Sequence, residues 1–298
     1  MSLKDILVVF DPLHSPEPRL QVAAALAARH GAHLTGLCVI PPVLPTEAGL
    51  PWSGAIAEAQ AVQRVRENLM GASLAAAARI EEGFRAAAEN SAVASEWRAP
   101  AGPPLETVPV HARYADLVIL GQIDPRHRSD AAFGLAEATL FGSGRPVLIV
   151  PYAGTFATVG RNVLVAWNAT RESARAVNDA LPLLEGADKV TVLAINPGHG
   201  GSELRPAARP VHGVGDDGNW PAADIAHHLA RHGVKAEAAY TISDEIDIGN
   251  TILSRAADFG VDSIVMGAYG HSRLREFVMG GATRTLLETM TVPVLLSH

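Results

Sequence analysis

The sequence of 298 residues repeats itself once, with a period near half its length. The run ILVVFD at Ile6–Asp11 resembles VLVAWN at Val163–Asn168, and each is followed by a polar stretch and an alanine-rich helical pattern. Near the end of each half, ADLVILG matches VDSIVMG, and RPVLIVP matches VPVLLSH. A chain that carries two copies of one pattern is expected to fold as two similar units.

Within each half, short apolar runs alternate with helical patterns. Three of the runs are continuously apolar: Leu117–Leu120, Val147–Val150 and Ile264–Met266. Such runs are typical of parallel strands that helices cover on both faces. Three longer segments have the apolar spacing of helices: Ala55–Glu89, Ala222–His232 and Gly249–Phe259. Each half therefore reads β-α-β-α-β-α-β-α-β, which predicts an α/β chain made of two tandem doubly wound parallel-sheet domains.

We place the two domains at residues 1–152 and 160–298, with the boundary in Tyr152–Arg161, where glycine and threonine interrupt the pattern. A duplicated domain can replace a two-fold homodimer, so the halves are expected to pack as an intramolecular pseudo-dimer. The terminal strands RPVLIV and VPVLLS would meet across it. Pairing of two whole chains into a homodimer is left open.

Composition limits the classes of partner. The formal net charge of −7 argues against general binding to nucleic acid or to anionic membranes. No stretch approaches the roughly 18 consecutive apolar residues that a membrane helix needs. Cys38 is the only cysteine and falls in a buried-type strand, so no disulfide within the chain is expected and the thiol should be inert. We expect a cytoplasmic protein without nucleic-acid or membrane partners.

Residues 267–287, GAYGHSRLREFVMGGATRTLL, form a loop that is rich in glycine. Gly267 ends an apolar strand, and Gly280–Gly281 opens a helix that is expected to place Ala282, Leu286, Leu287 and Met290 on one face. In open α/β sheets, ligands bind beyond the carboxyl ends of the strands, and the free N–H groups of a helix start suit a phosphate. The loop is predicted to hold phosphates, with added charge from Arg273, Arg275 and Arg284. The alternative is a tight strand-to-helix connection without a ligand.

The spacing Gly267-x2-Gly270-x9-Gly280, between an apolar strand and a terminal VPVLL strand, resembles the nucleotide-binding signature of the universal stress protein family. The duplicated halves resemble the tandem members of that family, so the resemblance covers nearly the whole chain. Two positions depart from the family pattern. Gly281 stands where the family has Ser or Thr, which removes a hydroxyl contact, and Asn168 stands where the family usually has Asp. An Asn side chain can still donate and accept hydrogen bonds.

By position, the resemblance implies a two-domain fold of the Rossmann-like, adenine-nucleotide-binding type, with a site for ATP or AMP in the second half. The nucleotide would bind there with or without Mg²⁺, and the alternative is a site that binds no nucleotide. The residues implied near the adenine and ribose are Ala166, Trp167, Asn168, Ile195, Met266 and Gly267. Those implied around the phosphates are Gly270, Gly280, Gly281, Ala282 and Thr283.

The first half keeps Asp11, Gly121 and Gly134 at positions matching Asn168, Gly267 and Gly280. However, the phosphate loop is degenerate, because the counterparts of Gly270, Gly281 and Thr283 are Asp124, Leu135 and Glu137. A carboxylate about 4 Å from a phosphate is repelled by about 1 kcal/mol even at the dielectric constant of water. Arg126 and Arg128 could offset part of this repulsion. We expect the first half not to bind a triphosphate.

Three functions follow from these patterns. The leading one is a universal stress protein that binds ATP or another adenine nucleotide in its second half and acts as a stress-response switch. The alternatives are a nucleotide-free dimeric scaffold for protein–protein interaction and a slow ATPase. No nucleophile elbow, Walker A sequence or zinc-protease motif stands out, so catalysis is not expected to be the purpose.

For two further features, an interpretation without a specific function is favoured. His228 and His232 have the spacing of a metal-binding pair on a helix, but solvated histidines are favoured because no third ligand is evident. The tract Pro197–Asp224 is rich in Gly, Pro and Asp, and replaces the long helix of the first half. It is expected to be a mobile surface loop, with a lid or a partner-docking segment as the alternative.

Overall fold

The computed structural model describes residues 2–12, 16–42, 55–123, 130–195, 221–243, 246–268 and 281–298. In this part of the chain, strands and helices alternate, and the predicted α/β fold is confirmed. The first half contains β1 (Asp5–Phe10), α1 (Glu17–His30), β2 (His33–Cys38), α2 (Ala55–Asn90), β3 (Ser95–Arg98), α3 (Pro104–Ala112), β4 (Leu117–Gly121), α4 (Asp130–Ser143) and β5 (Val147–Val150). The second half contains β6 (Asn162–Ala166), α5 (Arg171–Leu184), β7 (Lys189–Ile195), α6 (Pro221–Arg231), β8 (Ala236–Thr241), α7 (Ile248–Asp258), β9 (Ser263–Gly267), α8 (Gly281–Thr289) and β10 (Val294–Ser297).

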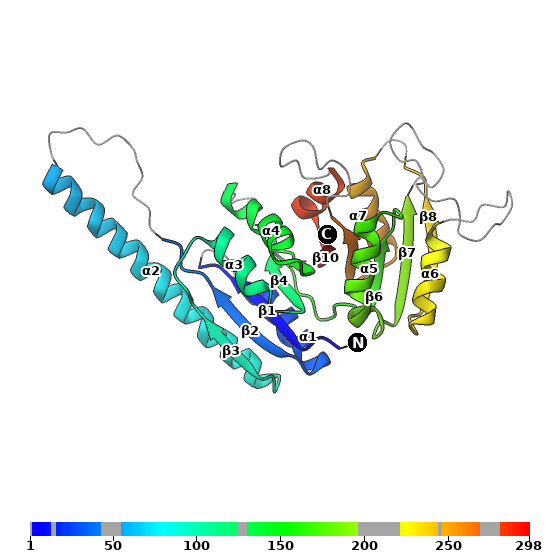
Figure 1. Ribbon diagram of the computed structural model, residues 1–298, viewed down its shortest axis with the longest axis horizontal. Helices are drawn as coiled ribbons and strands as arrows, with labels where there is room; N and C mark the ends of the chain where they lie inside the picture. Colours follow the sequence, from blue (N-terminus) through cyan, green and yellow to red (C-terminus); the bar gives the residue numbers. More distant parts are fainter. Residues whose placement is uncertain are drawn as a thin grey trace.

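The described strands form one continuous sheet, in the order β3-β2-β1-β4-β5-β10-β9-β6-β7-β8 (Figure 1). Neighbouring strands are parallel except for β5 and β10, which pair antiparallel with Leu295 opposite Leu148. The two terminal strands therefore meet as the sequence predicts, and the halves share a sheet. In each half the strand order reverses between the first and fourth strands. The connections that leave β1 and β4 therefore run in opposite directions, and so do those that leave β6 and β9.

Helices cover both faces of the sheet and enclose two aliphatic cores. Helices α1, α2, α5 and α6 pack on one face, through residues such as Leu26, Phe84, Val177 and Leu229. Helices α3, α4, α7 and α8 pack on the other, through Val108, Leu140, Ile252 and Leu286. The continuously apolar strands are buried along their whole length, as in β5 and β10. This double cover is the physical reason for their unbroken apolar runs.

The observed helices start close to the predicted positions, with one correction. The tract Pro197–Asp224 is predicted to be a loop, but Pro221–Asp224 forms the first turn of α6. Proline is favoured at the first position of a helix, because the N–H that it lacks has no partner there. Residues 197–220, the rest of this tract, lie outside the described part. Helix α7 begins after Asp247, whose carboxylate accepts hydrogen bonds from the N–H groups of Gly249 and Asn250.

The connection between β5 and β6 runs along α1 and is held from both sides. The Arg29 guanidinium of α1 donates to the carbonyl oxygen of Val159 at 2.8 Å. The Asp262 carboxylate accepts from the N–H groups of Gly160 and Arg161 at 2.9 Å each. Gly160 has a φ of 78°, a left-handed conformation that favours glycine. Among the described helices, none has the length and apolar character needed to cross a membrane.

Candidate functional site

The reversal of strand order in the second half brings most of the predicted adenine-side residues to one edge of the sheet. Ala166 at the end of β6 lies opposite Met266 of β9 on one side and Leu193 of β7 on the other. Ile195 ends β7, and Gly267 ends β9. Ligands of open α/β sheets bind at such a reversal. Gly270 and Gly280, which are predicted to line the phosphates, lie outside the described residues.

The turn after β6 uses the side chain of Asn168. Its amide oxygen accepts hydrogen bonds from Thr170 N at 3.2 Å and Thr170 Oγ1 at 2.8 Å. Ala169 between them has a φ of 58°, and Thr170 in turn caps α5 by accepting from Ser173 N. The oxygen of Asn168 is therefore already committed to starting α5, and only its NH₂ group could serve a ligand.

Trp167 lies beside this turn and faces the core on the α5 side of the sheet. Its backbone N–H donates to Leu193 O at 2.9 Å, which continues the pairing of β6 with β7 by one residue. The indole Nε1 is buried and has no hydrogen-bond partner in the described structure. A buried indole N–H normally finds a partner, and this one lies on the α5 side of the sheet, on the opposite face from α8.

Gly267 is required by packing. A Cβ at this position would lie 2.5 Å from the carbonyl carbon of Glu172 and 2.5 Å from Ser173 N. No side chain fits at that distance, so the first turn of α5 lies directly on the end of β9. The sequence interpretation, which assigned this glycine to a ligand, did not anticipate the contact. Glycine at a strand end is one way for a helix to pack closely on a sheet.

Glu172 adds a buried carboxylate at this contact, with 8% of the residue exposed. Burial alone would raise its pKa. Hydrogen bonds from its own backbone N–H, from Arg171 and from Thr170 outweigh burial and hold the pKa of the carboxyl below its ordinary value. The group is therefore negatively charged at neutral pH, which makes the α5 side of the strand ends unfavourable for a phosphate.

Helix α8 presents a different glycine. Gly281, at its first residue, is exposed, and beyond its chain neighbours and its own helix no atom of the described residues lies within 4 Å of the position of a Cβ. Thr283 is only 3% exposed and shares the buried face of α8 with Leu286. Its hydroxyl therefore lies on the core side of α8. Ala282 and Leu287 are half-buried, and Met290, just after the helix, is buried as predicted. Arg284 is exposed and pairs with Glu288 at 3.1 Å, whereas Arg273 and Arg275 lie outside the described part.

In the first half, the corresponding strand ends are occupied by Arg19 of α1, a residue that the sequence interpretation missed. Its guanidinium donates to Val9 O at 2.9 Å, lies 3.7 Å from the Asp11 carboxylate and 5.7 Å from the centre of the Phe10 ring. Only 6% of the residue is exposed. Burial lowers the pKa of Arg19, and the Asp11 carboxylate acts against this. One signal in the sequence could have predicted the burial of Arg19: it has the spacing from Ala23 and Leu26 that places all three on one face of a helix.

Gly121 makes room for this arginine. A Cβ on Gly121 would lie 2.8 Å from Arg19 Nε. The matching glycines of the two halves thus face different neighbours, a helix backbone in the second half and a guanidinium in the first. The residues that degrade the phosphate loop are described only in part: Leu135 packs on the core, and burial raises the pKa of Glu137. Asp124, Arg126 and Arg128 lie outside the described residues.

The predicted histidine pair consists of His228 near the end of α6 and His232 just after it. The rings of His228 and His232 meet edge to face with centroids 4.8 Å apart. Within the described residues, no group of three or more His, Cys, Asp or Glu side chains is arranged to hold a metal ion.

Comparison with known proteins gives one consistent result. The family model described as "Universal stress protein family" matches residues 2–151 and again residues 160–298. A curated universal stress protein, Slr1230 of Synechocystis sp., is 33% identical over 91 residues. That alignment covers 29% of this chain and 31% of Slr1230, so the chain matches about a third of the length of this relative.

Two solved structures share the fold over almost the whole chain. A universal stress protein from Archaeoglobus fulgidus has a TM-score of 0.67 at 14% identity, covering 98% of this chain and 97% of its own. A functionally unknown protein from Pseudomonas aeruginosa has a TM-score of 0.54 at 15% identity, covering 99% and 92%. At these identities the likeness shows the shared architecture alone.

Proposed function

Because the chain belongs to the universal stress protein family, as the two matches to the family model establish, we propose that its second half binds an adenine nucleotide, ATP or AMP with or without Mg²⁺. The bound state would act as a stress-response switch. Binding, and not turnover, is the proposed function.

The observation that carries this proposal is the arrangement at the β6/β9 strand ends. Ala166 and Met266 lie side by side there and face the core on the α8 side, and Gly281, the exposed first residue of α8, has no other element of the described residues against it. Exposed N–H groups at a helix start attract a phosphate, and a glycine lets it approach the backbone. The buried positions of Glu172 and Thr283 favour a nucleotide that approaches from the α8 side and is held by backbone donors.

The first half supplies an internal comparison. There the guanidinium of Arg19 lies against Gly121 and fills the space beside the ends of β1 and β4. This supports the expectation that only the second half binds a nucleotide, on steric grounds in addition to the carboxylates of the degenerate loop. One site per chain is therefore proposed.

A switch requires that the nucleotide binds one conformation more tightly than another. Helix α8 carries Gly281 at one end, and at the other end the carbonyl oxygen of Leu287 accepts a hydrogen bond from Gln122 of the first half. A nucleotide held at the start of α8 would thus act on an element that both halves contact. This contact is the proposed route from the ligand to the rest of the molecule.

The test is a calorimetric titration with ATP and with AMP, combined with thermal unfolding. A free ligand concentration of 100 times Kd should stabilise the protein by about 2.7 kcal/mol. Gly281→Asp places a carboxylate at the helix start and should weaken binding at least tenfold, because it repels phosphate. The matched control Gly281→Ser supplies the hydroxyl of the family pattern and should bind at least as tightly as the natural protein. Unchanged unfolding in millimolar nucleotide would refute the proposal.

One observation favours the nucleotide-free scaffold as a second candidate. Val65 and Leu69 lie one turn apart on the same side of α2 and are 56% and 51% exposed, and part of this helix projects away from the sheet (Figure 1). Large apolar side chains gathered on one helix are typical of a protein-binding surface. Self-association that is lost in Leu69→Lys, as measured by light scattering, and that does not depend on added nucleotide would support this candidate.

A further inference from the structure

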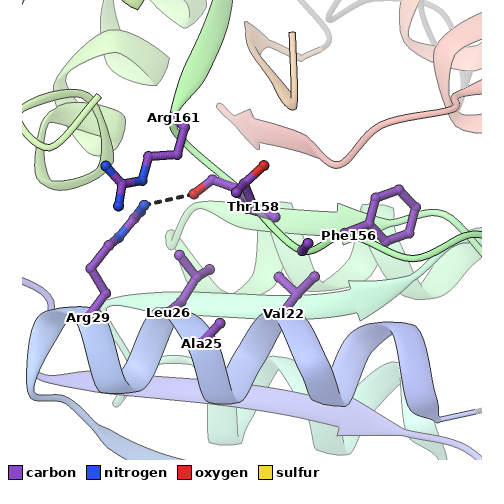
Figure 2. Close-up of a pocket in the computed structure, with 9 residues that line it drawn as sticks. Val22, Ala25, Leu26, Arg29, Phe156, Thr158 and Arg161 are labelled. Atoms are coloured by element: carbon purple, nitrogen blue, oxygen red, sulfur yellow. Dashed lines mark hydrogen bonds between the residues drawn. The ribbon is translucent and has the colours of Figure 1, made fainter. Parts of the chain in front are cut away.

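A pocket of about 160 Å³ lies between α1 and the connection that joins the two halves (Figure 2). Its floor is apolar: Val22, Ala25 and Leu26 project from α1, and Phe156 lies beside them from the connecting segment. Val22 and Leu26 are buried, with 0% and 2% of each residue exposed. The apolar surface that a ligand can reach in the pocket is therefore supplied by Ala25, which is exposed, and by Phe156, which is half-buried.

Two arginines stand together on the rim of this pocket. Arg29 rises from α1 and Arg161 from the segment just before β6, and their guanidinium groups lie close to each other in Figure 2. In the described structure Arg29 has no carboxylate partner and donates only to Val159 O. Arg161 pairs with Asp188 at 3.4 Å, where both side chains are more than half exposed. Such an exposed pair is weak, so Arg161 is free to turn to another anion.

The electrostatic setting agrees with this arrangement. Partial desolvation lowers the pKa of Arg29, and the positive charge of Arg161 lowers it further. Asp262 acts in the opposite direction, but its carboxylate is bound by the N–H groups of Gly160 and Arg161. Two cationic groups therefore repel each other over an apolar floor, and an anion between them would remove that repulsion.

We propose that this pocket binds a small organic carboxylate, with its apolar body on Ala25 and Phe156, above the buried Val22 and Leu26, and its carboxylate between Arg29 and Arg161. The size fits, because a cavity of about 150 Å³ accommodates a benzene ring. Guanidinium groups bind carboxylates in a planar, two-pronged geometry. Thr158 on the same rim can add a hydroxyl donor.

This site is distinct from the proposed nucleotide site. Arg161 precedes β6, whereas Asn168 follows it, so the two sites lie at opposite edges of the sheet. The pocket is formed by α1 of the first half and by residues that lead into the second. A ligand bound there would contact both halves at their junction.

The test uses sodium benzoate as the probe and benzamide as its neutral isostere. Binding is followed in the full chain through the methyl resonances of Val22 and Leu26, with and without ATP. Benzoate should shift these resonances in a saturable manner at millimolar concentrations, and benzamide should bind about tenfold more weakly. Because the two sites are separate, the shifts are expected whether or not ATP binds.

Three variants locate the interaction. Arg161→Gln should weaken benzoate binding about two- to fivefold, the range that an exposed ion pair supports. Ala25→Leu fills the pocket with a good helix former and should abolish the methyl shifts. Arg85→Gln, an exposed, paired arginine on α2, is the matched control and should leave binding unchanged. No saturable shift, equal binding of benzamide, or full binding by both Arg161→Gln and Ala25→Leu would each overturn the proposal.

Discussion

Two glycines of the predicted phosphate loop differ in what a side chain would meet. The position of a Cβ on Gly267 is 2.5 Å from backbone atoms of Glu172 and Ser173, which cannot move without shifting α5. A Cβ on Gly281 would meet no atom of the described residues within 4 Å beyond its chain neighbours and its own helix. A glycine motif therefore combines two requirements, close packing at the strand end and access at the helix start, and only the second bears on a ligand.

Gly267→Ala is therefore expected to lower the free energy of unfolding by about 2–3 kcal/mol, because an inserted methyl group forces the backbone of α5 away. Gly281→Ala is the matched control and should be neutral or stabilising by up to about 1 kcal/mol, since alanine favours the helix. Urea unfolding of both variants measures the difference. Equal stability of the two would show that α5 yields easily at this contact.

Arg19 makes a second prediction from a single side chain. Arg19→Ala removes a buried guanidinium that contacts Val9, Phe10 and Asp11. The loss should be about 2–4 kcal/mol of unfolding free energy, at or just below the range for breaking a buried ion pair. Asp11→Asn should cost about 1 kcal/mol or less, because the Asp11 side chain is 41% exposed and an amide oxygen can still accept. Urea unfolding distinguishes them, and equal losses would contradict the packing role of the guanidinium.

The order of helices and strands could be predicted because the inner strands carry their own signal, whereas the edge strands β3 and β8 are only partly buried and have no continuous apolar run. Runs such as Val147–Val150 are apolar throughout, since helices cover both faces of the sheet, and the duplication shows where each run recurs. The pairing of β5 with β10 followed from the symmetry of the two copies. The apolar runs depend on local sequence and the pairing on the duplication, and the structure reproduces both.

The neighbours at the strand ends could not be predicted in the same way. An arginine on a helix normally indicates a solvated face, yet Arg19 is buried because Gly121, about a hundred positions away, leaves room for it. Likewise, the contact of Gly267 with the first turn of α5 depends on how that helix is placed on β9 and β10. Both contacts join residues that are far apart in the sequence, so the spacing of the glycines does not predict them.

Gln122 links three elements across the junction of the halves. Its Nε2 donates to Leu287 O of α8 at 3.0 Å, and its Oε1 accepts from Tyr152 N at 3.3 Å. Gln122 itself is only 6% exposed, so removing its side chain leaves the carbonyl oxygen of Leu287 without its partner in a partly buried place. Among the described helices, α8 is thus the one that carries both the proposed phosphate contact and a tie to β4.

Gln122→Ala is expected to reduce the unfolding free energy by about 1–3 kcal/mol, because it leaves polar groups buried without a partner. Amide hydrogen exchange in α8 should accelerate at the same time. Gln63→Ala, which removes an exposed glutamine bonded to Glu67 on α2, is the control and should change stability by less than about 0.5 kcal/mol. A stability loss without faster exchange in α8 would place the effect elsewhere.

The molecule as a whole is joined through one sheet, which makes separate unfolding of the halves unfavourable. Leu148 and Leu295 at the β5–β10 pair are 0% and 1% exposed, so parting the halves would expose both strands and the cores beside them. A nucleotide that stabilises the second half should therefore also protect the first. Cys38 can report on this, because it is the only cysteine and ends β2 in the first half.

The thiol also gives the stability of the chain a defined pH dependence. Burial first, and the Asp11 carboxylate second, raise the pKa of Cys38 to about 11, against the opposing charge of Arg19. The unfolded thiol ionises near pH 8.5–9. The folded state thus holds a proton that the unfolded state releases, so this contribution is complete below about pH 8.5 and is lost as the pH rises through about 11.

A shift of about two pKa units corresponds to about 2–3 kcal/mol of unfolding free energy, and this contribution is lost between about pH 9 and 11. The measurement compares urea unfolding of the natural protein and of Cys38→Ala across this range, because lysines and tyrosines titrate in both and cancel. The natural protein should lose more stability than the variant as the pH rises. Alkylation of Cys38 near pH 8 should require opening of the first half, and saturating ATP should slow it if the two halves open together. Parallel pH profiles of the two proteins would mean that the thiol is hydrated in the folded state, and labelling as fast as that of a free thiol would mean that β2 opens on its own.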